Sequence, residues 1–258
     1  MADFLIERCE VTNAGYARFV EAGGYARREF WKVPFVRDGR ELSFEEATAL
    51  FTDLTGRPGP ATWEVGSYPD GKGEHPVGGL SWYEAAAYAE FAGRELPTIY
   101  HWNMAAFTFG SSEIIPRSNF GEGPVPVGTS GGENRYGAVD MAGNVREWCW
   151  NESARGGERF ILGGGWNDQR YAFNDAFAAD PFDRSATNGV RCILTPGGEP
   201  NRAGLRAAID TPFRDFSSEV PVDDETFAVF LRQFDYDAKP LDAAVEREED
   251  QGVGVRQV

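Results

Sequence analysis

The sequence predicts an α+β domain that is rich in loops and contains short helices and small antiparallel sheets. Three observations predict this fold class. The 258 residues include 31 glycines, which suit many turns and loops. Aromatic residues make up 14% of the chain, so large rings can supply the burial that long regular elements supply elsewhere. Helix-start signals cluster before residue 107, whereas glycine-rich segments with short apolar runs follow it. The length allows one sizeable core with an appendage.

The first part of the chain carries most of the helix signals. Residues 4–9 predict a short strand, and a helix capped by Thr12 or Asn13 follows and ends at Gly23. After a turn at residues 38–39, two capping boxes at 43–46 and 81–84 begin further helices. The helix that begins at 43–46 is predicted to end near residue 53, and a Gly/Pro-rich loop follows at 55–73. The helix that begins at 81–84 is predicted to end at residue 93, and a third helix is predicted from 97 to about 107.

Glycine-rich loops then dominate to Gly165, with short strands predicted at 159–162 and 189–194. From residue 197 the composition becomes acidic, with 14 acidic against 7 basic residues. We therefore predict one domain at 1–196 and a linker-like C-terminal extension at 197–258. The extension contains one candidate amphipathic helix at 223–234, with Phe227, Phe230, Leu231 and Phe234 on one side.

Residues 140–147 form a candidate metal site. Asp140, Asn144 and Glu147 bring three oxygen-bearing side chains together around Gly143, which allows a tight turn. Hard oxygen ligands on a short loop suit Ca²⁺ better than a transition metal. The alternative is that Asp140 and Asn144 cap turns and that Glu147 forms a local salt bridge.

Six motifs, taken in order, resemble the formylglycine-generating enzyme (sulfatase-modifying factor) domain. They lie at residues 10–20, 75–89, 96–102, 143–148, 162–166 and 188–192. The resemblance implies a C-type-lectin-like fold that often holds structural calcium. It also implies the ligands of that ion: the side chains of Asp140 and Glu147 with the backbone carbonyls near Gly143 and Val145. Asn119 is similar to a ligand of a second calcium site of the family.

The same resemblance implies an oxidase chemistry that this sequence does not support. Family enzymes oxidise a substrate cysteine with copper held by two thiolates, and copper(I) requires such soft ligands. Asp168 and Phe173 stand where those cysteines are expected, and no cysteine occurs between Cys149 and Cys192. Gly165 replaces the serine of the motif, and Arg146 replaces a tryptophan. We therefore predict no copper and no formylglycine-generating activity.

A second catalytic branch of the superfamily is similar to sulfoxide synthases of the ergothioneine pathway, which hold iron with three histidines. This chain has two histidines, His75 and His101, and they are 26 positions apart. Their spacing does not form a pair on one helical turn, so we predict no iron.

The leading functional hypothesis is a non-catalytic binding or sensing module that uses the cleft of the absent copper site. Tryptophan and arginine are favoured at recognition sites because they combine a large contact area with directional polar groups. One alternative is an oxidoreductase or another enzyme of altered chemistry, with Asp168 as a general base or metal ligand. Another is a variable protein of a diversity-generating retroelement, because residues 167–188 are rich in Asn and Asp. The predicted cleft residues are Arg146, Trp166, Asn167, Asp168, Arg170 and Phe173.

Charge and segment patterns limit the partners and the location. The net charge of −16 disfavours nucleic acid and anionic membranes as partners. No apolar run approaches 18 residues and the N-terminal residues lack a signal-peptide pattern, so we predict a cytoplasmic protein. Cys9, Cys149 and Cys192 are predicted to be free thiols, with a Cys149–Cys192 disulfide as the alternative. The C-terminal extension resembles linkers of bacterial proteins that also carry a Ser/Thr kinase and a hydrolase-like domain.

Overall fold

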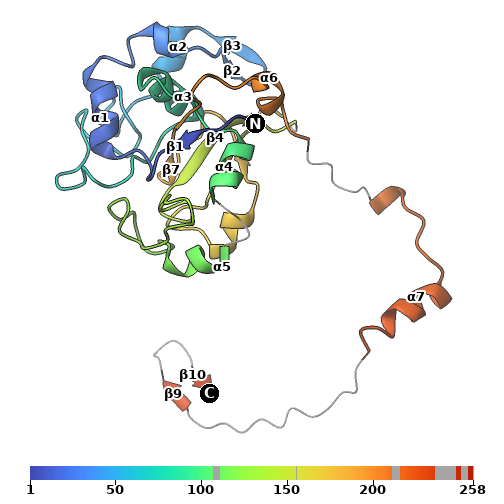
Figure 1. Cartoon of the computed structure of the whole chain (residues 1–258). Helices are drawn as coiled ribbons and strands as arrows, with labels where there is room; N and C mark the ends of the chain where they lie inside the picture. Colours follow the sequence, from blue (N-terminus) through green and yellow to red (C-terminus); the bar gives the residue numbers. More distant parts are fainter. Residues whose placement is uncertain (107–110, 155, 211–215, 236–247, 251–254, 258) are drawn as a thin grey trace. The chain divides into compact units, whose positions relative to one another are not determined.

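The computed structural model describes residues 1–106, 111–154, 156–210, 216–235, 248–250 and 255–257. Contacts divide the chain into two compact units, Met1–Thr211 and Pro212–Val258. The first unit contains all the elements that position the candidate site (Figure 1). Within the described residues, no helix combines the length and the apolar character needed to cross a bilayer.

A four-stranded sheet lies at the centre of the first unit. Its strand order is β6 (Ala178–Ala179), β5 (Arg159–Leu162), β4 (Arg146–Glu152) and β7 (Asn188–Gly189). The β4–β5 and β5–β6 pairs are antiparallel, as predicted, but β4 and β7 are parallel. The strand at 159–162 is confirmed. The longest strand, β4, lies inside the region for which the sequence predicts loops.

This sheet is buried on both faces. Successive side chains of a strand point to opposite faces. Accordingly, Trp148 and Ile161 join one hydrophobic core, whereas Cys149, Phe160 and Leu162 join a second core. The helices α3 (Trp82–Phe91) and α4 (Ile99–Ala106) both contact β4. The sheet therefore lies between two hydrophobic cores, and packing on both faces holds its strands in place.

The predicted helices begin where their caps predict. Thr12 accepts a hydrogen bond from the amide of Gly15 and begins α1 (Asn13–Glu21). Capping boxes begin α2 (Phe44–Thr48) and α3. However, α2 ends before the predicted bound near residue 53. There the Asp53 carboxylate accepts three backbone N–H groups, from Thr55, Arg57 and Gly66, and so stabilises a loop in place of further helical turns.

Short elements complete the first unit. A tight turn at Asp38 and Gly39, with φ of +52° and +74°, joins β2 (Phe35–Arg37) to β3 (Arg40–Leu42) and confirms the predicted turn. The remaining elements are β1 (Leu5–Ile6), η1 (Arg28–Phe30), α5 (Ser111–Ile114), η3 (Ile115–Arg117), η4 (Arg170–Asn174), β8 (Ile193–Leu194) and α6 (Arg202–Leu205).

The single strand predicted at 189–194 is divided between two sheets. Gly189 pairs with Glu147 of β4, whereas Ile193 pairs with Ile6 of β1. Between them the side chain of Arg191 is fully buried and forms an ion pair with Glu147. Arg191 turns its charged side chain into the interior, and its hydrogen bonds fix the direction of the chain there. The strand is therefore interrupted at this residue.

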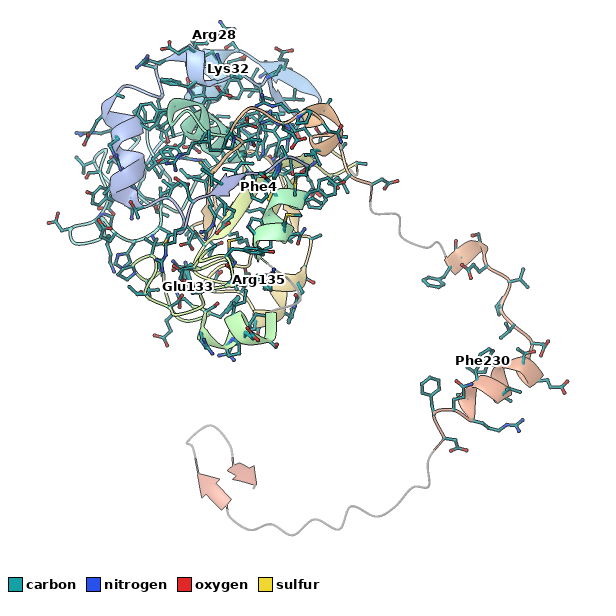
Figure 2. The ribbon with its side chains drawn as sticks, viewed as in Figure 1. Phe4, Arg28, Lys32, Glu133, Arg135 and Phe230 are labelled. Atoms are coloured by element: carbon teal, nitrogen blue, oxygen red, sulfur yellow. The ribbon has the colours of Figure 1, made fainter. Side chains whose placement is uncertain are left out.

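The second unit contains η5 (Phe216–Ser218), α7 (Asp224–Leu231) and the hairpin of β9 (Glu248–Asp250) and β10 (Val255–Gln257). Asp223 caps α7, which begins one residue after the start of the predicted range and ends three residues before its end. The exposed fractions of its apolar side chains exceed one half, including that of Phe230 (Figure 2). The domain boundary after residue 196 stays a prediction. Residues 197–210 belong to the first compact unit, and Asn151 donates hydrogen bonds to the carbonyls of Leu205 and Ala207.

A second buried ion pair joins α3 to distant loops. Arg184 donates from Nε and Nη2 to both oxygens of Glu84, at 2.8 and 2.9 Å, and also to carbonyls at Thr52 and Gly59. Glu84 is the third residue of α3, closes the Ser81 capping box and is fully buried. One carboxylate therefore holds a helix start and the loop at 50–60 together.

The two capping boxes provide a matched test of this pair. We expect Glu84→Gln to lower the free energy of unfolding by about 3–5 kcal/mol, because it leaves the Arg184 guanidinium without its buried counter-charge. Glu46→Gln changes the same helix position, but Glu46 is exposed and pairs with Arg40 at the surface. We expect a much smaller effect there. Urea unfolding of both variants measures the difference, and equal losses would contradict the assigned role of Arg184.

Candidate ligand-binding site

The site is built on the glycine-rich loop that follows β5. Gly163 and Gly164 have φ of +96° and +73°, a conformation that residues with a side chain rarely adopt. Gly165 is buried, and a Cβ at this position would lie 2.6 Å from the Thr187 side chain. Thr187, in the turn before β7, therefore leaves no room for a side chain at position 165.

Arg146 and Asp168 form a bidentate ion pair at the base of this loop. Arg146 Nε donates to Asp168 Oδ2 at 2.7 Å, and Nη2 donates to Oδ1 at 2.6 Å. The amide of Gly165 also donates to Oδ2, at 2.6 Å. The Phe177 ring lies 4.4 Å from Arg146 Cζ, in a cation–π contact. Side-chain exposures of 19% and 17% show that the pair is largely shielded from solvent.

The pair sets the protonation state of Asp168. Burial alone would raise its pKa, but the hydrogen bonds from Arg146 and from the Gly165 amide outweigh burial and hold the pKa below its usual value. Asp168 is therefore an ionised carboxylate whose oxygens already accept three hydrogen bonds. It has little tendency to take a proton.

Two hollows flank the loop and share the residues Asn167, Asp168, Gln169 and Tyr171. The first, about 440 Å³, is also lined by Phe120, Trp166 and Arg170. The second, about 290 Å³, is also lined by Arg146 and Phe177. We call the two together the Asp168 cleft. Five of the six predicted cleft residues line it.

The sixth predicted cleft residue, Phe173, lies elsewhere. It is 2% exposed and packs in the second core, with its ring 5.8 Å from that of Trp102. Its 3-10 helix, η4, turns the ring inward below the loop. This large apolar side chain therefore contributes to stability and does not line the cleft.

A third hollow, of about 230 Å³, was not predicted. It is lined by Trp63, Lys72, His75 and Trp166, among other residues. Trp166 also lines the Asp168 cleft, so this side chain forms part of both walls. The lining residues come from segments between Asn13 and Ala186, and no local sequence pattern connects them.

Comparison with known proteins identifies the family. The model of the sulfatase-modifying factor enzyme 1-like domain matches residues 1–196. The chain belongs to this family. The crystal structure of CarF shares the fold, with a TM-score of 0.51 and 21% sequence identity over 74% of this chain and 86% of CarF. The predicted loop-rich α+β fold of the family is thereby confirmed.

Relatives in the family carry different names. The chain is 34% identical over 188 residues to a formylglycine-generating enzyme of Thermomonospora curvata, covering 58% of this chain and 60% of that protein. It is 31% identical to the serine/threonine-protein kinase pkn1 of Chlamydia pneumoniae and 30% identical to a hercynine oxygenase of Mycolicibacterium smegmatis. These two matches cover 57% and 56% of this chain, but only 22% and 36% of the relatives. The chain therefore spans less than two thirds of each of these proteins.

The donor atoms at the cleft do not fit the copper centre that the resemblance implies. All three cysteines are free thiols. Cys149 and Cys192 are fully buried, and they belong to opposite cores. Burial raises the pKa of both thiols above the usual value, which disfavours the thiolate form that copper(I) binds. The alternative disulfide between these two residues does not form.

The predicted calcium ligands are also engaged with protein groups. Glu147 Oε1 accepts from Nε and Nη2 of Arg191, at 2.9 and 2.7 Å, and Oε2 accepts from Trp102 Nε1 at 2.7 Å. The Asp140 carboxylate accepts from the amide of Gly128 and from the Ser130 hydroxyl. Because a guanidinium already contacts Glu147, this side chain does not fit a bound divalent cation.

The backbone of the same loop is equally constrained. Gly143 and Asn144 have φ of +74° and +58°, and the Asn144 amide donates to the carbonyl of Asn119. Asn119 donates from Nδ2 to Asn144 Oδ1. The amide of Val145 faces Glu10. Among the described residues, no group of three or more His, Cys, Asp or Glu side chains is arranged to hold a metal. The described residues of this loop therefore do not fit the calcium ion that the resemblance implies.

We expect Asp168→Asn to lower the melting temperature at pH 7, because it removes the charge that pairs with Arg146. Since the pKa of Asp168 is depressed in the folded protein, the carboxylate stabilises the fold above its unfolded-state pKa, and this contribution is lost as pH falls through the folded-state value. The difference between wild type and variant should therefore shrink towards pH 3. Asp175→Asn, which lines the same cleft, is the control; an equal loss in both variants would contradict the assignment.

We expect addition of calcium to leave the melting temperature unchanged, because Arg191 already neutralises Glu147. A ligand that binds only the folded state must raise the melting temperature. Thermal unfolding in millimolar calcium and in excess EDTA measures this effect. A calcium-dependent rise that EDTA reverses would instead support an ion in the 140–147 loop.

Proposed function

We propose that this domain is a non-catalytic ligand-binding module and that its ligand occupies the Asp168 cleft. The Arg146–Asp168 ion pair is the observation that supports this proposal. Its two side chains stand at positions where the family resemblance implies a tryptophan and a copper-binding thiolate. A satisfied ion pair holds the loop in one conformation, which favours recognition over chemistry at these two positions.

The glycine at position 165 supports the same proposal. The resemblance implies an active-site serine there, and Thr187 fills the space that its side chain would need. Restoring the serine alone would therefore cause a steric clash. The difference from the enzymes therefore involves the packing of Thr187, in the turn before β7, as well as the glycine-rich loop.

An enzyme of altered chemistry at the same cleft receives less support. Asp168 is the carboxylate predicted as a general base, but its depressed pKa and its three hydrogen bonds make it a poor proton acceptor at neutral pH. Neither of the two histidines lines the cleft.

The cleft surface offers groups suited to recognition. Asn167, Gln169 and Arg170 are exposed, and the Tyr171 ring is 67% exposed. Amide and guanidinium groups supply directional hydrogen bonds, and the aromatic rings of Trp166 and Tyr171 supply contact area. A ligand with both polar and flat apolar parts matches this set.

Two further proposals concern the context of the domain. Free thiols at Cys9, Cys149 and Cys192 are consistent with a reducing compartment, so we propose a cytoplasmic location. The match to part of a protein kinase suggests that the domain derives from a multidomain bacterial protein, in which it would sense a ligand.

The decisive test is an activity assay with a peptide that contains the Cys-x-Pro-x-Arg sulfatase motif. We expect no conversion of its cysteine to an aldehyde, with or without added copper, because the cleft lacks thiolates. Mass spectrometry of the peptide measures the conversion. The formylglycine-generating enzyme of Thermomonospora curvata serves as the positive control. Aldehyde formation by this chain would overturn the proposal.

A further inference from the structure

The third hollow contains side chains whose hydrogen-bonding groups have no partner. Trp166 Nε1 and His75 Nδ1 are both buried and make no hydrogen bond in the structure. His75 as a whole is 8% exposed. In contrast, Trp63 Nε1, in the same hollow, donates to Asn13 Oδ1 at 2.8 Å. Buried polar groups without partners cost free energy, so a pair of them beside one hollow calls for a ligand group.

Both unpartnered atoms are hydrogen-bond donors. An indole N–H can only donate. Lys72 Nζ lies 3.1 Å from His75 Nε2, and an ammonium group can only donate, so Nε2 accepts. Burial, and to a lesser degree the Lys72 charge, lowers the pKa of His75, so the ring is neutral at pH 7. The single ring proton is therefore on Nδ1.

Lys72 supplies a positive charge at the same place. Its side chain is exposed, and none of the ion pairs among the described residues involves it, although Asp70 and Glu74 are near in sequence. The hollow thus combines one ammonium group, two donors without acceptors, and the flat apolar surfaces of two tryptophans and three prolines.

We infer that this hollow, the Lys72 pocket, binds the carboxylate end of an organic ligand. A carboxylate offers only acceptor atoms and a negative charge, which complements two donors and an ammonium group. The tryptophan and proline surfaces suit an apolar body next to the carboxylate. Because both nitrogens are covered, small rotations of the Trp166 and His75 rings accompany contact with the ligand.

The size and position of the pocket indicate how such a ligand lies. At about 230 Å³ the Lys72 pocket is smaller than the roughly 300 Å³ at which pockets for whole ligands begin, so it fits an end group. Trp166 lines both this pocket and the Asp168 cleft. A longer ligand would therefore cross Trp166 and place its other end in the cleft. This inference rests on the proposed binding function and adds the chemical class of the ligand.

NMR titration of the ¹⁵N-labelled full chain with benzoate tests the inference. Benzoate should shift the indole N–H resonance of Trp166, which is identified by its absence from the spectrum of Trp166→Phe. Lys72→Gln should weaken benzoate binding about tenfold, because it removes the charge that faces the carboxylate. Lys32→Gln is the matched control, since Lys32 is an exposed lysine on the segment after η1 (Figure 2), and it should bind like wild type.

Benzamide, which has the same shape without the charge, should bind at least tenfold more weakly than benzoate. An N-acetyl dipeptide with a free C-terminus, compared with its C-terminal amide, distinguishes a peptide terminus from a small acid as the source of the carboxylate. Tighter binding of the dipeptide acid than of benzoate supports a peptide terminus, and weaker binding supports a small acid.

Two results would overturn the inference: no shift of the Trp166 resonance at saturating benzoate, or equal weakening by Lys72→Gln and Lys32→Gln. Because aldehyde formation and benzoate binding are measured separately, failure of the proposed function and failure of this inference are distinguishable. Activity on the cysteine peptide would leave the Lys72 pocket in place.

Discussion

The buried Arg191–Glu147 ion pair is the interaction on which the rest of this structure depends. Both side chains are essentially inaccessible to solvent. Arg191 also donates to the carbonyls of Glu7 and Val139, and Glu147 also accepts from Trp102. The segments that contain Glu7, Trp102 of α4 and Val139 therefore meet at this ion pair. Breaking such a pair leaves an uncompensated buried charge, which is strongly destabilising.

This ion pair also positions the candidate site. Glu147 and Arg146 are adjacent in β4, so fixing Glu147 in the interior directs Arg146 to the opposite face, where it meets Asp168. The parallel pairing of Arg146 with Asn188 brings Thr187 next to the glycine-rich loop. Burial also raises the pKa of the nearby Glu10 carboxyl group well above its usual value. Arg191 offsets only part of this effect on Glu10, whereas it pairs directly with Glu147.

The family relationship and the cleft chemistry are separate properties of this chain. The scaffold requires the glycines, the capping boxes and the buried ion pairs, and these are present. The cleft instead contains a satisfied ion pair and a glycine packed against a threonine. A fold can hold different side chains at the same site without loss of stability, because the site lies on loops and the two hydrophobic cores stabilise the fold.

Much of the fold and part of the site could be predicted from the sequence, because their signals are local. Ser43, Ser81 and Asp38–Gly39 begin helices or form a turn through contacts with residues three or four positions away, and the structure confirms them. Five cleft residues lie within the loop that the Gly-Gly-Gly-Trp motif marks and the strand next to it. Motifs of this kind also sufficed to indicate the family.

The sequence by itself determined the family, the helix starts and the position of the cleft loop. Only the tertiary structure decided the remaining features. In β4 the buried residues include Glu147 and Asn151, whose polar side chains hide the alternation that predicts a strand. Phe173 turns into the core, Arg191 divides a strand between two sheets, and Lys72, His75 and Trp166 meet at one pocket. Each of these depends on contacts between residues far apart in the chain, and such contacts leave no periodic pattern in the sequence.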